Sequence, residues 1–148
     1  MKRRVMTLLG VTACVIAVAP FASAAPATSK QENCNVSVEY PHRSKGAPDR
    51  RILFKTRVTC TGDFSTVTVH IDGELLEGGP NGKKVVVASS SLSQQVITNG
   101  GPQTYYTPST SGHQVYAAGW YTAVADGEIV APVRGAMGKW QTQTIFVK

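Results

Sequence analysis

The stretch ILFKTRVTC, residues 52–60, decides the fold class. Its even-numbered positions are apolar or small, whereas the odd-numbered positions from 55 onward are lysine, arginine and threonine. This two-residue alternation is the pattern of a strand with one buried face and one solvated face. The preceding stretch CNVSVEY, residues 34–40, alternates in the same way and also carries a cysteine on its apolar face. The sequence therefore predicts two β-strands whose cysteines, Cys34 and Cys60, both face a core.

Further alternating segments follow, and each is bounded by glycine, proline, asparagine or aspartate. Asp72-Gly73 and Asp126-Gly127 predict two tight hairpins, because Asp-Gly favours a two-residue turn. Residues 102–112 are rich in threonine, proline and serine and are expected to form the longest loop. No segment shows the period of an amphipathic helix. The remaining predicted strands are residues 66–71, 84–89, 92–98, 114–125, 128–133 and 141–147.

Seven or eight short strands without a helix predict an all-β fold, an antiparallel β-sandwich with one disulfide. A closed barrel is the alternative. In an immunoglobulin-like sandwich a tryptophan packs beside the disulfide. Trp120 and Trp140 are the two tryptophans, and neither lies between the cysteines. We therefore expect a sandwich and leave an immunoglobulin-like strand order open.

The N-terminus has the composition of a secretory signal peptide. Basic residues at positions 2–4 precede an apolar run, and Ala22-Ser23-Ala24 fits the small-residue pattern that a signal peptidase cleaves. The predicted organisation is a signal peptide at residues 1–24, a flexible segment at residues 25–33 and a single β-sandwich domain at residues 34–148.

Cleavage predicts a secreted, extracellular chain. Cys14 lies inside the apolar run and not at its end, which favours release over lipid attachment at that cysteine. No other segment approaches the roughly 18 apolar residues of a membrane-spanning helix, so no membrane insertion is expected after cleavage. The mature chain would keep two cysteines, Cys34 and Cys60, which we expect to form a disulfide in an oxidising compartment. Their spacing is not that of a zinc site, so neither a metal nor another cofactor is predicted.

Removal of the leader also halves the net charge. The whole sequence has 15 Lys and Arg against 9 Asp and Glu, a net charge of +6, and loss of the three basic leader residues lowers it to +3. This is an ordinary charge for a domain of this size, so nucleic acid is not an expected partner.

Residues 34–60 resemble the start of a family of uncharacterised small secreted proteins of actinobacteria. The similarity rests on Cys34-Asn35-Val36, on Pro41-His42-Arg43-Ser44 and on the basic strand that ends at Cys60. Members of that family are all-β proteins stapled by cysteines. The resemblance implies a fold and a compartment, and it implies no catalytic residue.

Basic residues concentrate between positions 43 and 57, where six lysines and arginines accompany one aspartate. The loop between the first two strands holds four of the six. A polyanion, such as a teichoic acid or an acidic polysaccharide, would supply the complementary charge. A solvated loop without a ligand is the alternative. The candidate binding residues of this loop are Arg43, Lys45, Arg50 and Arg51.

Aromatic residues suggest a second candidate surface. Tyr105 and Tyr106 lie in the predicted hydroxyl-rich loop, and such rings commonly contact sugars and proteins. On the following strand, Tyr116 and Trp120 share one face while Tyr121 takes the other, so one of these faces is expected in the core. Buried packing of the aromatics is the alternative. The sequence therefore predicts ligand binding by Tyr105, Tyr106 and Trp120.

Known catalytic motifs are not found. The three histidines, His42, His70 and His113, follow no pattern that identifies a catalytic triad. We predict a secreted, non-enzymatic binding module for a cell-surface glycan or protein. The alternative is a small inhibitor of a secreted hydrolase, which would present Thr107-Pro108-Ser109 to the cleft of its target.

Overall fold

The computed structural model describes residues 30–46 and 50–148. Within these residues the chain forms nine strands and no helix, which confirms the all-β prediction and adds one strand to the expected number. The predicted signal peptide lies outside the described residues. No described helix is long and apolar enough to cross a membrane.

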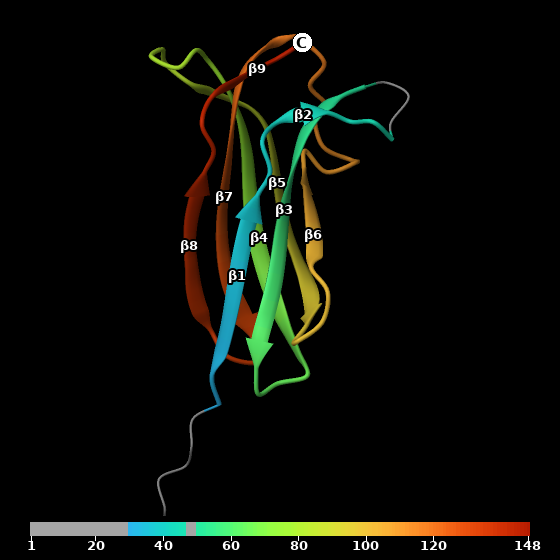
Figure 1. Ribbon diagram of the computed structural model, residues 1–148, viewed down its shortest axis with the longest axis vertical. Coiled ribbons are helices and arrows are strands. Elements are labelled where there is room, and N and C mark those ends of the chain that lie inside the picture. Colours follow the sequence, from blue (N-terminus) through green and yellow to red (C-terminus); the bar gives the residue numbers. More distant parts are fainter. Residues whose placement is uncertain (1–29, 47–49) are drawn as a thin grey trace, which may run out of the picture.

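Two antiparallel sheets pack face to face as a sandwich (Figure 1). The smaller sheet contains β1 (Glu32–Val38), β2 (His42–Arg43), β3 (Ile52–Gly62) and β6 (Gln103–Thr107). In it β3 is central, with β1 and β2 along one side and β6 on the other. The larger sheet contains β4 (Thr66–Glu77), β5 (Val85–Ile97), β7 (Gly119–Ala131), β8 (Gly135–Gln141) and β9 (Ile145–Val147). Its order is β5-β4-β7, and β8 and β9 pair with successive parts of β7.

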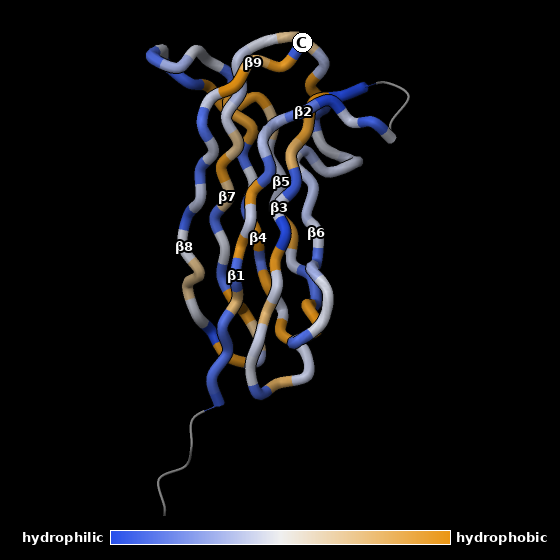
Figure 2. Tube along the Cα trace, in the orientation of Figure 1, coloured by the Kyte–Doolittle hydropathy of each residue, from blue (hydrophilic) through white to orange (hydrophobic). Residues whose placement is uncertain are grey.

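The core lies between the two sheets and follows from the alternation in the sequence. Figure 2 shows hydrophobic and hydrophilic residues alternating along β3 and β4. All even-numbered residues of β3 from Ile52 to Cys60 are buried, as the sequence predicted. The larger sheet contributes Ile71, Leu75 and Tyr121, which are also fully buried. Burial of these side chains provides the main favourable free energy of folding.

Cys34 and Cys60 form the predicted disulfide. They are direct register partners on β1 and β3, and Cys60 is 2% exposed. Their Cα atoms are 4.0 Å apart. This is shorter than the usual disulfide range of about 4.4–6.8 Å, and also shorter than the roughly 4.5 Å between the closest directly opposite positions of an antiparallel pair. The bond joins neighbouring strands of one sheet, whereas the immunoglobulin disulfide joins two sheets.

Both predicted Asp-Gly hairpins are wrong. Asp72-Gly73 lies inside β4 and Asp126-Gly127 lies inside β7, and Asp72 pairs directly with Asp126. The buried alternation of β4 passes through this point without a break, from Ile71 to Leu75. Because β4 is hydrogen bonded to β5 on one side and to β7 on the other, the two ladders outweigh the local preference for a turn.

Two further predictions in the middle of the chain are wrong. The separate strands expected at residues 84–89 and 92–98 are one strand, β5, because Ser90 and Ser91 continue the pairing with β4. The loop expected at residues 102–112 begins with a strand, β6, which pairs with β3. The loop was expected because threonine and proline are frequent there, but threonine is also a good strand residue.

Strand boundaries near both ends of the chain differ from the predicted ones. Glu32 and Asn33 belong to β1, although residues 25–33 were expected to be flexible. The predicted strand at 128–133 is the end of β7, and the one at 141–147 is divided between β8 and β9. Pairing with β3 orders Glu32 and Asn33, and pairing with β7 orders the other two segments; residues 25–29 lie outside the described residues.

Candidate functional site

An open pocket of about 610 Å³ lies on the smaller sheet, at the end where β2 pairs with β3. β2, β9 and the C-terminal residue gather at this end (Figure 1). The residues that give the pocket its chemistry come from β2 and the residues after it, from β3 and from β6. They are His42, Arg43, Lys45, Leu53, Lys55 and Tyr106. The fold thus brings part of the predicted basic surface together with part of the predicted aromatic surface.

Backbone pairing positions the basic segment. His42 pairs with Leu53, and Arg43 pairs with Ile52. Just beyond them, the Ser44 amide donates a hydrogen bond of 2.8 Å to the carbonyl of Arg51. These contacts hold the start of the basic segment against β3.

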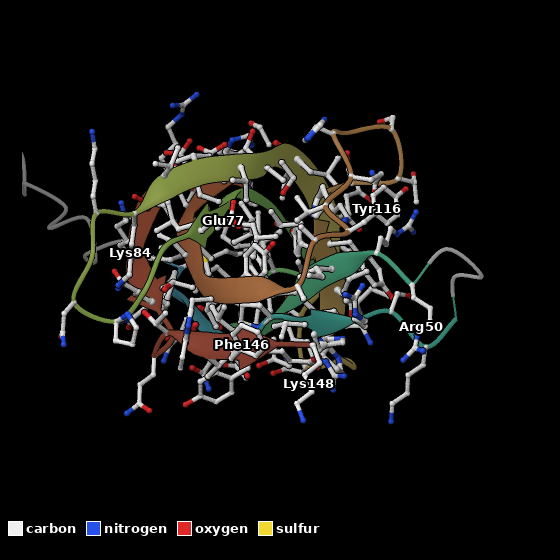
Figure 3. The ribbon with its side chains drawn as sticks, turned by 90° about the horizontal axis from the view of Figure 1, so that it is seen from above. Arg50, Glu77, Lys84, Tyr116, Phe146 and Lys148 are labelled. Carbon is white, nitrogen blue, oxygen red and sulfur yellow. A yellow bond between two sulfur atoms is a disulfide. The ribbon has the colours of Figure 1, made fainter. Side chains whose placement is uncertain are left out.

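Arg43 is fixed by two backbone carbonyls. Its Nη1 donates to the carbonyl of Arg50 at 3.0 Å, and its Nε donates to the carbonyl of Lys148. Figure 3 views the molecule from one end of the sandwich. In this view the two residues that supply these carbonyls, Arg50 and Lys148, lie on the same side of the molecule, and Glu77 and Tyr116 lie on the opposite side. Because a guanidinium stays protonated in proteins, Arg43 gives the pocket a permanent positive charge at a defined position.

The hydrogen bond of His42 determines which of its ring nitrogens is a donor and which is an acceptor. Its Nδ1 lies 2.8 Å from the carbonyl oxygen of Tyr40. A carbonyl only accepts hydrogen bonds, so Nδ1 carries the proton and Nε2 is an acceptor in the neutral ring.

Lys55 and Tyr106 form the opposite wall. They are direct register partners on β3 and β6, and Lys55 Nζ lies 5.8 Å from the centre of the Tyr106 ring, within cation–π distance. Tyr106 is 47% exposed, whereas Leu53 is buried at 4% and gives the pocket an apolar part. The pocket therefore combines positive charge with an accessible aromatic ring.

The acidic residue at the pocket is neutralised by a neighbour outside it. Glu39 lines the pocket, and its carboxylate lies 2.7 Å from Nη2 of Arg57. Both side chains are partly exposed, so this pair stabilises the fold only slightly. Because Arg57 balances Glu39, the charges of Arg43, Lys45 and Lys55 leave the pocket positive.

Tyr105 is not a binding residue, and that prediction is wrong. It is 2% exposed, packs in the core between the sheets, and donates a hydrogen bond of 3.0 Å to the carbonyl of Val69. Burial raises the pKa of Tyr105 to about 12, because the phenolate would be poorly solvated there. Successive residues of a strand face opposite sides, so β6 exposes Tyr106 and buries its neighbour.

Three other predicted binding residues do not line the pocket. The Trp120 ring on β7 lies 5.4 Å from that of Phe146 in an edge-to-face contact and is 43% exposed, while Tyr121 is fully buried. Alternation along this strand thus places one aromatic face in the core, as expected. Arg50 and Arg51 supply backbone carbonyls that accept hydrogen bonds from Arg43 and Ser44.

His70 lies in a polar cluster on the outer face of the larger sheet. Its Nε2 is 3.3 Å from the carboxylate of Asp72, and its Nδ1 is 2.8 Å from the hydroxyl of Ser93. Serine hydrolases use the same three residue types, but they also need amide donors for the oxyanion. The amides of β4 are engaged in its ladders with β5 and β7. The absence of enzymatic activity stays a prediction.

The same outer face carries an acidic, hydroxyl-rich pocket. It has a volume of about 550 Å³, and three carboxylates, those of Asp72, Glu74 and Asp126, line it together with serines and one lysine, Lys139. Within residues 30–46 and 50–148, no group of three or more His, Cys, Asp and Glu side chains could hold a metal ion. The two outer faces of the sandwich therefore differ in charge, with a basic pocket on one and an acidic pocket on the other.

The segment expected to enter a protease cleft is largely inaccessible. Thr107 and Pro108 are buried, and Ser109 is partly exposed. Binding of this triplet in an extended form would require the end of β6 to leave the sheet. Inhibition of a hydrolase stays a prediction.

No protein-family model matches the chain, and no curated protein matches its sequence. Among solved structures, the chain is similar to the crystal structure of a Bordetella pertussis protein with the provisional name ApaA. The match covers 80% of this chain and 97% of that chain, with 13% sequence identity and a TM-score of 0.30. A likeness at this level supports no argument about function.

Proposed function

We propose that this protein is a secreted, non-enzymatic binding module that holds an acidic glycan in the pocket between β2, β3 and β6. The observation that supports the proposal is the presence of Arg43, Lys55 and Tyr106 around one pocket. Two of these residues supply positive charge, and the third supplies an exposed aromatic ring.

An acidic glycan matches both features. Its carboxylates or phosphates would accept hydrogen bonds from the guanidinium of Arg43 and the ammonium groups of Lys45 and Lys55. The apolar face of a sugar ring would pack on Tyr106, whose ring is rigid and amphipathic. The volume of about 610 Å³ is within the range of small-molecule sites.

The compartment supports the same class of ligand. A signal-peptide pattern begins the chain, and the disulfide between Cys34 and Cys60 is typical of oxidising, extracytoplasmic compartments. Anionic glycans of the cell surface, including teichoic acids and acidic polysaccharides, would be accessible there.

Calorimetric titration of the mature chain, residues 25–148, tests the proposal. Three oligosaccharides of equal length serve as probes: an oligogalacturonate with carboxylates, a phosphorylated glucan, and a neutral glucan. We expect binding of one or both acidic probes, weakening as salt is added, and no binding of the neutral probe. The two acidic probes show which anion the pocket prefers.

Substitution of Tyr106 separates stacking from charge attraction. Tyr106→Ala is expected to lower the affinity for the acidic oligomer about tenfold, a loss of about 1.4 kcal/mol. Tyr116→Ala is the matched control, because Tyr116 is 48% exposed and does not line the pocket. Equal affinity of the wild type and Tyr106→Ala, or equal binding of the neutral glucan, would contradict the proposal.

A further inference from the structure

β5 forms an edge of the larger sheet. It pairs with β4 on one side, and no other described strand pairs with it. The strand has 13 residues, VVVASSSLSQQVI, of which none is charged and none is proline. A strand edge of this kind offers backbone amides and carbonyls to a further strand.

Edge strands are usually protected against such pairing by charge, proline, irregular pairing or short length. The opposite edge of the same sheet is shorter and charged, because β8 has only 7 residues and includes Lys139; each edge strand has one register shift, β8 with β7 between Gly127 and Glu128 and β5 with β4 between Leu75 and Leu76. β5 is long, and it exposes apolar side chains along its length. Their exposed fractions are 56% for Val85, 48% for Val86, 43% for Leu92 and 66% for Ile97.

The sequence of β5 matches itself when two copies run antiparallel about a two-fold axis at Leu92. Leu92 then lies opposite Leu92 of the second copy, and Ala88 lies opposite Val96. Between Leu75 and Leu76 the register with β4 shifts, which leaves Val87 as an extra residue in β5. With this extra residue counted, Val86 lies opposite Ile97.

In this register the paired apolar side chains of the two β5 strands also lie on the same face of the joined sheet. Leu92 pairs with Ile71, which points into the core, so both Leu92 side chains lie on the core side. Val86 pairs with Leu76, and Ile97 pairs with Thr66; both β4 residues alternate with buried ones and therefore face outward. Three of the four exposed apolar side chains of β5 thus meet an apolar partner on the same face, whereas the fourth, Val85 at the start of the strand, lies opposite Thr98.

We propose that β5 is a dimerisation strand, and that two copies of this chain join through antiparallel β5–β5 pairing centred on Leu92. A second copy fits this edge because two identical strands without charge meet no like-charge repulsion, and because a two-fold axis satisfies both edges at once. The larger sheet then continues from one copy into the other.

The dimer leaves the basic pockets accessible. They lie on the smaller sheet, whereas β5 belongs to the larger one. Adjacent antiparallel strands present equivalent faces to the same side of a sheet. Both pockets therefore open on the same side of the dimer, an arrangement suited to two sites on one polymer.

Sedimentation equilibrium of the mature chain between 1 and about 200 μM tests the proposal. We expect the measured mass to rise with concentration to twice the chain mass. Leu92→Lys and Leu92→Glu should each stay monomeric, because two like charges would meet at the axis. An equimolar mixture of the two variants should dimerise, because Lys then faces Glu.

Two controls identify the strand and its register. Ala136→Lys places the same charge on the opposite edge strand, β8, and should not change dimerisation. Under oxidation, Leu92→Cys should form a disulfide-linked dimer on a non-reducing gel, whereas Ser89→Cys, which faces Gln95 in this register, should not. Thermal unfolding of each variant verifies that it is folded.

Three results would overturn the proposal. The wild type could be monomeric over the whole concentration range, it could form oligomers larger than a dimer, or its dimer could be unaffected by Leu92→Lys. If the mixture of Leu92→Lys and Leu92→Glu does not dimerise and Leu92→Cys forms no disulfide-linked dimer, the register centred on Leu92 is wrong. Since Leu92 is remote in sequence from the pocket residues and lies on the other sheet, glycan binding by the monomeric variants would still test the proposed function separately.

Discussion

Neighbouring tyrosines of β6 have different roles because successive side chains of a strand face opposite sides. Tyr105 is buried and Tyr106 is exposed. We expect Tyr105→Ala to lower the free energy of unfolding by about 3–5 kcal/mol, the usual cost of removing a buried ring, and Tyr106→Ala to change it by less than about 0.5 kcal/mol. Urea unfolding measures both values. Similar losses in the two variants would show that the faces of β6 are assigned wrongly.

The hydroxyl of Tyr105 also predicts a pH dependence. Its pKa is raised to about 12 in the folded chain by burial, compared with about 10 in an unfolded chain. Between these two values the unfolded chain loses the proton and the folded chain keeps it, so stability must fall as the pH rises from about 10 to about 12. Below about pH 10 this contribution does not change with pH.

Tyr105→Phe isolates that contribution. The variant cannot ionise at this position, so its free energy of unfolding should fall less steeply between about pH 10 and about pH 12 than that of the wild type. Urea unfolding at several pH values provides the comparison. Identical slopes for the two proteins would be inconsistent with a raised pKa at Tyr105.

At the scale of the elements, Gly73 of β4 lets a side chain of the other sheet come close to the backbone of the larger sheet. A Cβ atom at Gly73 of β4 would lie 2.0 Å from Thr107 Oγ1 of β6. We expect Gly73→Ala to destabilise the fold by about 1–3 kcal/mol through overpacking, and Thr107→Ala to relieve part of that cost in the double variant. Gly101→Ala, with no atom within 4 Å of its Cβ, is the control. Equal unfolding free energies for Gly73→Ala and the control would contradict this packing.

The disulfide acts on one pair of strands. β1 pairs only with β3 among the described strands, and the bond between Cys34 and Cys60 fixes that pair. Replacing both cysteines by alanine should cost about 2–5 kcal/mol and should increase amide hydrogen exchange in β1 before it does so in β4. Uniformly faster exchange throughout both sheets would show that the bond has no local role.

Titration of the unreduced, unfolded mature chain should find no free thiol.

The sequence predicts some of these elements and misses others for identifiable reasons. The alternation of β3 predicts both its buried face and the disulfide, because those depend on residues within two short segments. The same alternation continues in phase across Asp72-Gly73, and this signal could have excluded the hairpin that a dipeptide preference suggested. Local turn preference fails there because hydrogen bonds to β5 and β7 are made by residues distant in sequence.

The candidate site could be predicted only in part. Arg43, Lys45 and Tyr106 are among the predicted binding residues that do line the pocket. These residues meet at one pocket because β6 pairs with β3, which places Tyr106 opposite Lys55 although the two are far apart in sequence. No local pattern contains that pairing, so the sequence alone could not show that basic and aromatic residues line one pocket.

For the whole molecule, the distribution of charge matters more than its total. The smaller sheet carries the basic pocket, whereas three carboxylates, Asp72, Glu74 and Asp126, outnumber the one lysine, Lys139, in the pocket on the larger sheet. A polyanion should therefore be attracted to one face of the sandwich and repelled from the other. The interaction should weaken with added salt, since exposed charges separated by more than about 10 Å are screened at 0.1 M ionic strength.

An NMR titration of the ¹⁵N-labelled mature chain with the preferred acidic oligomer tests the proposed site most directly. The account predicts that the largest amide shifts occur at His42, Arg43, Lys55 and Tyr106, with little change at Asp72 and Asp126 on the other face. Shifts confined to the larger sheet, or no shifts at millimolar oligomer, would contradict it.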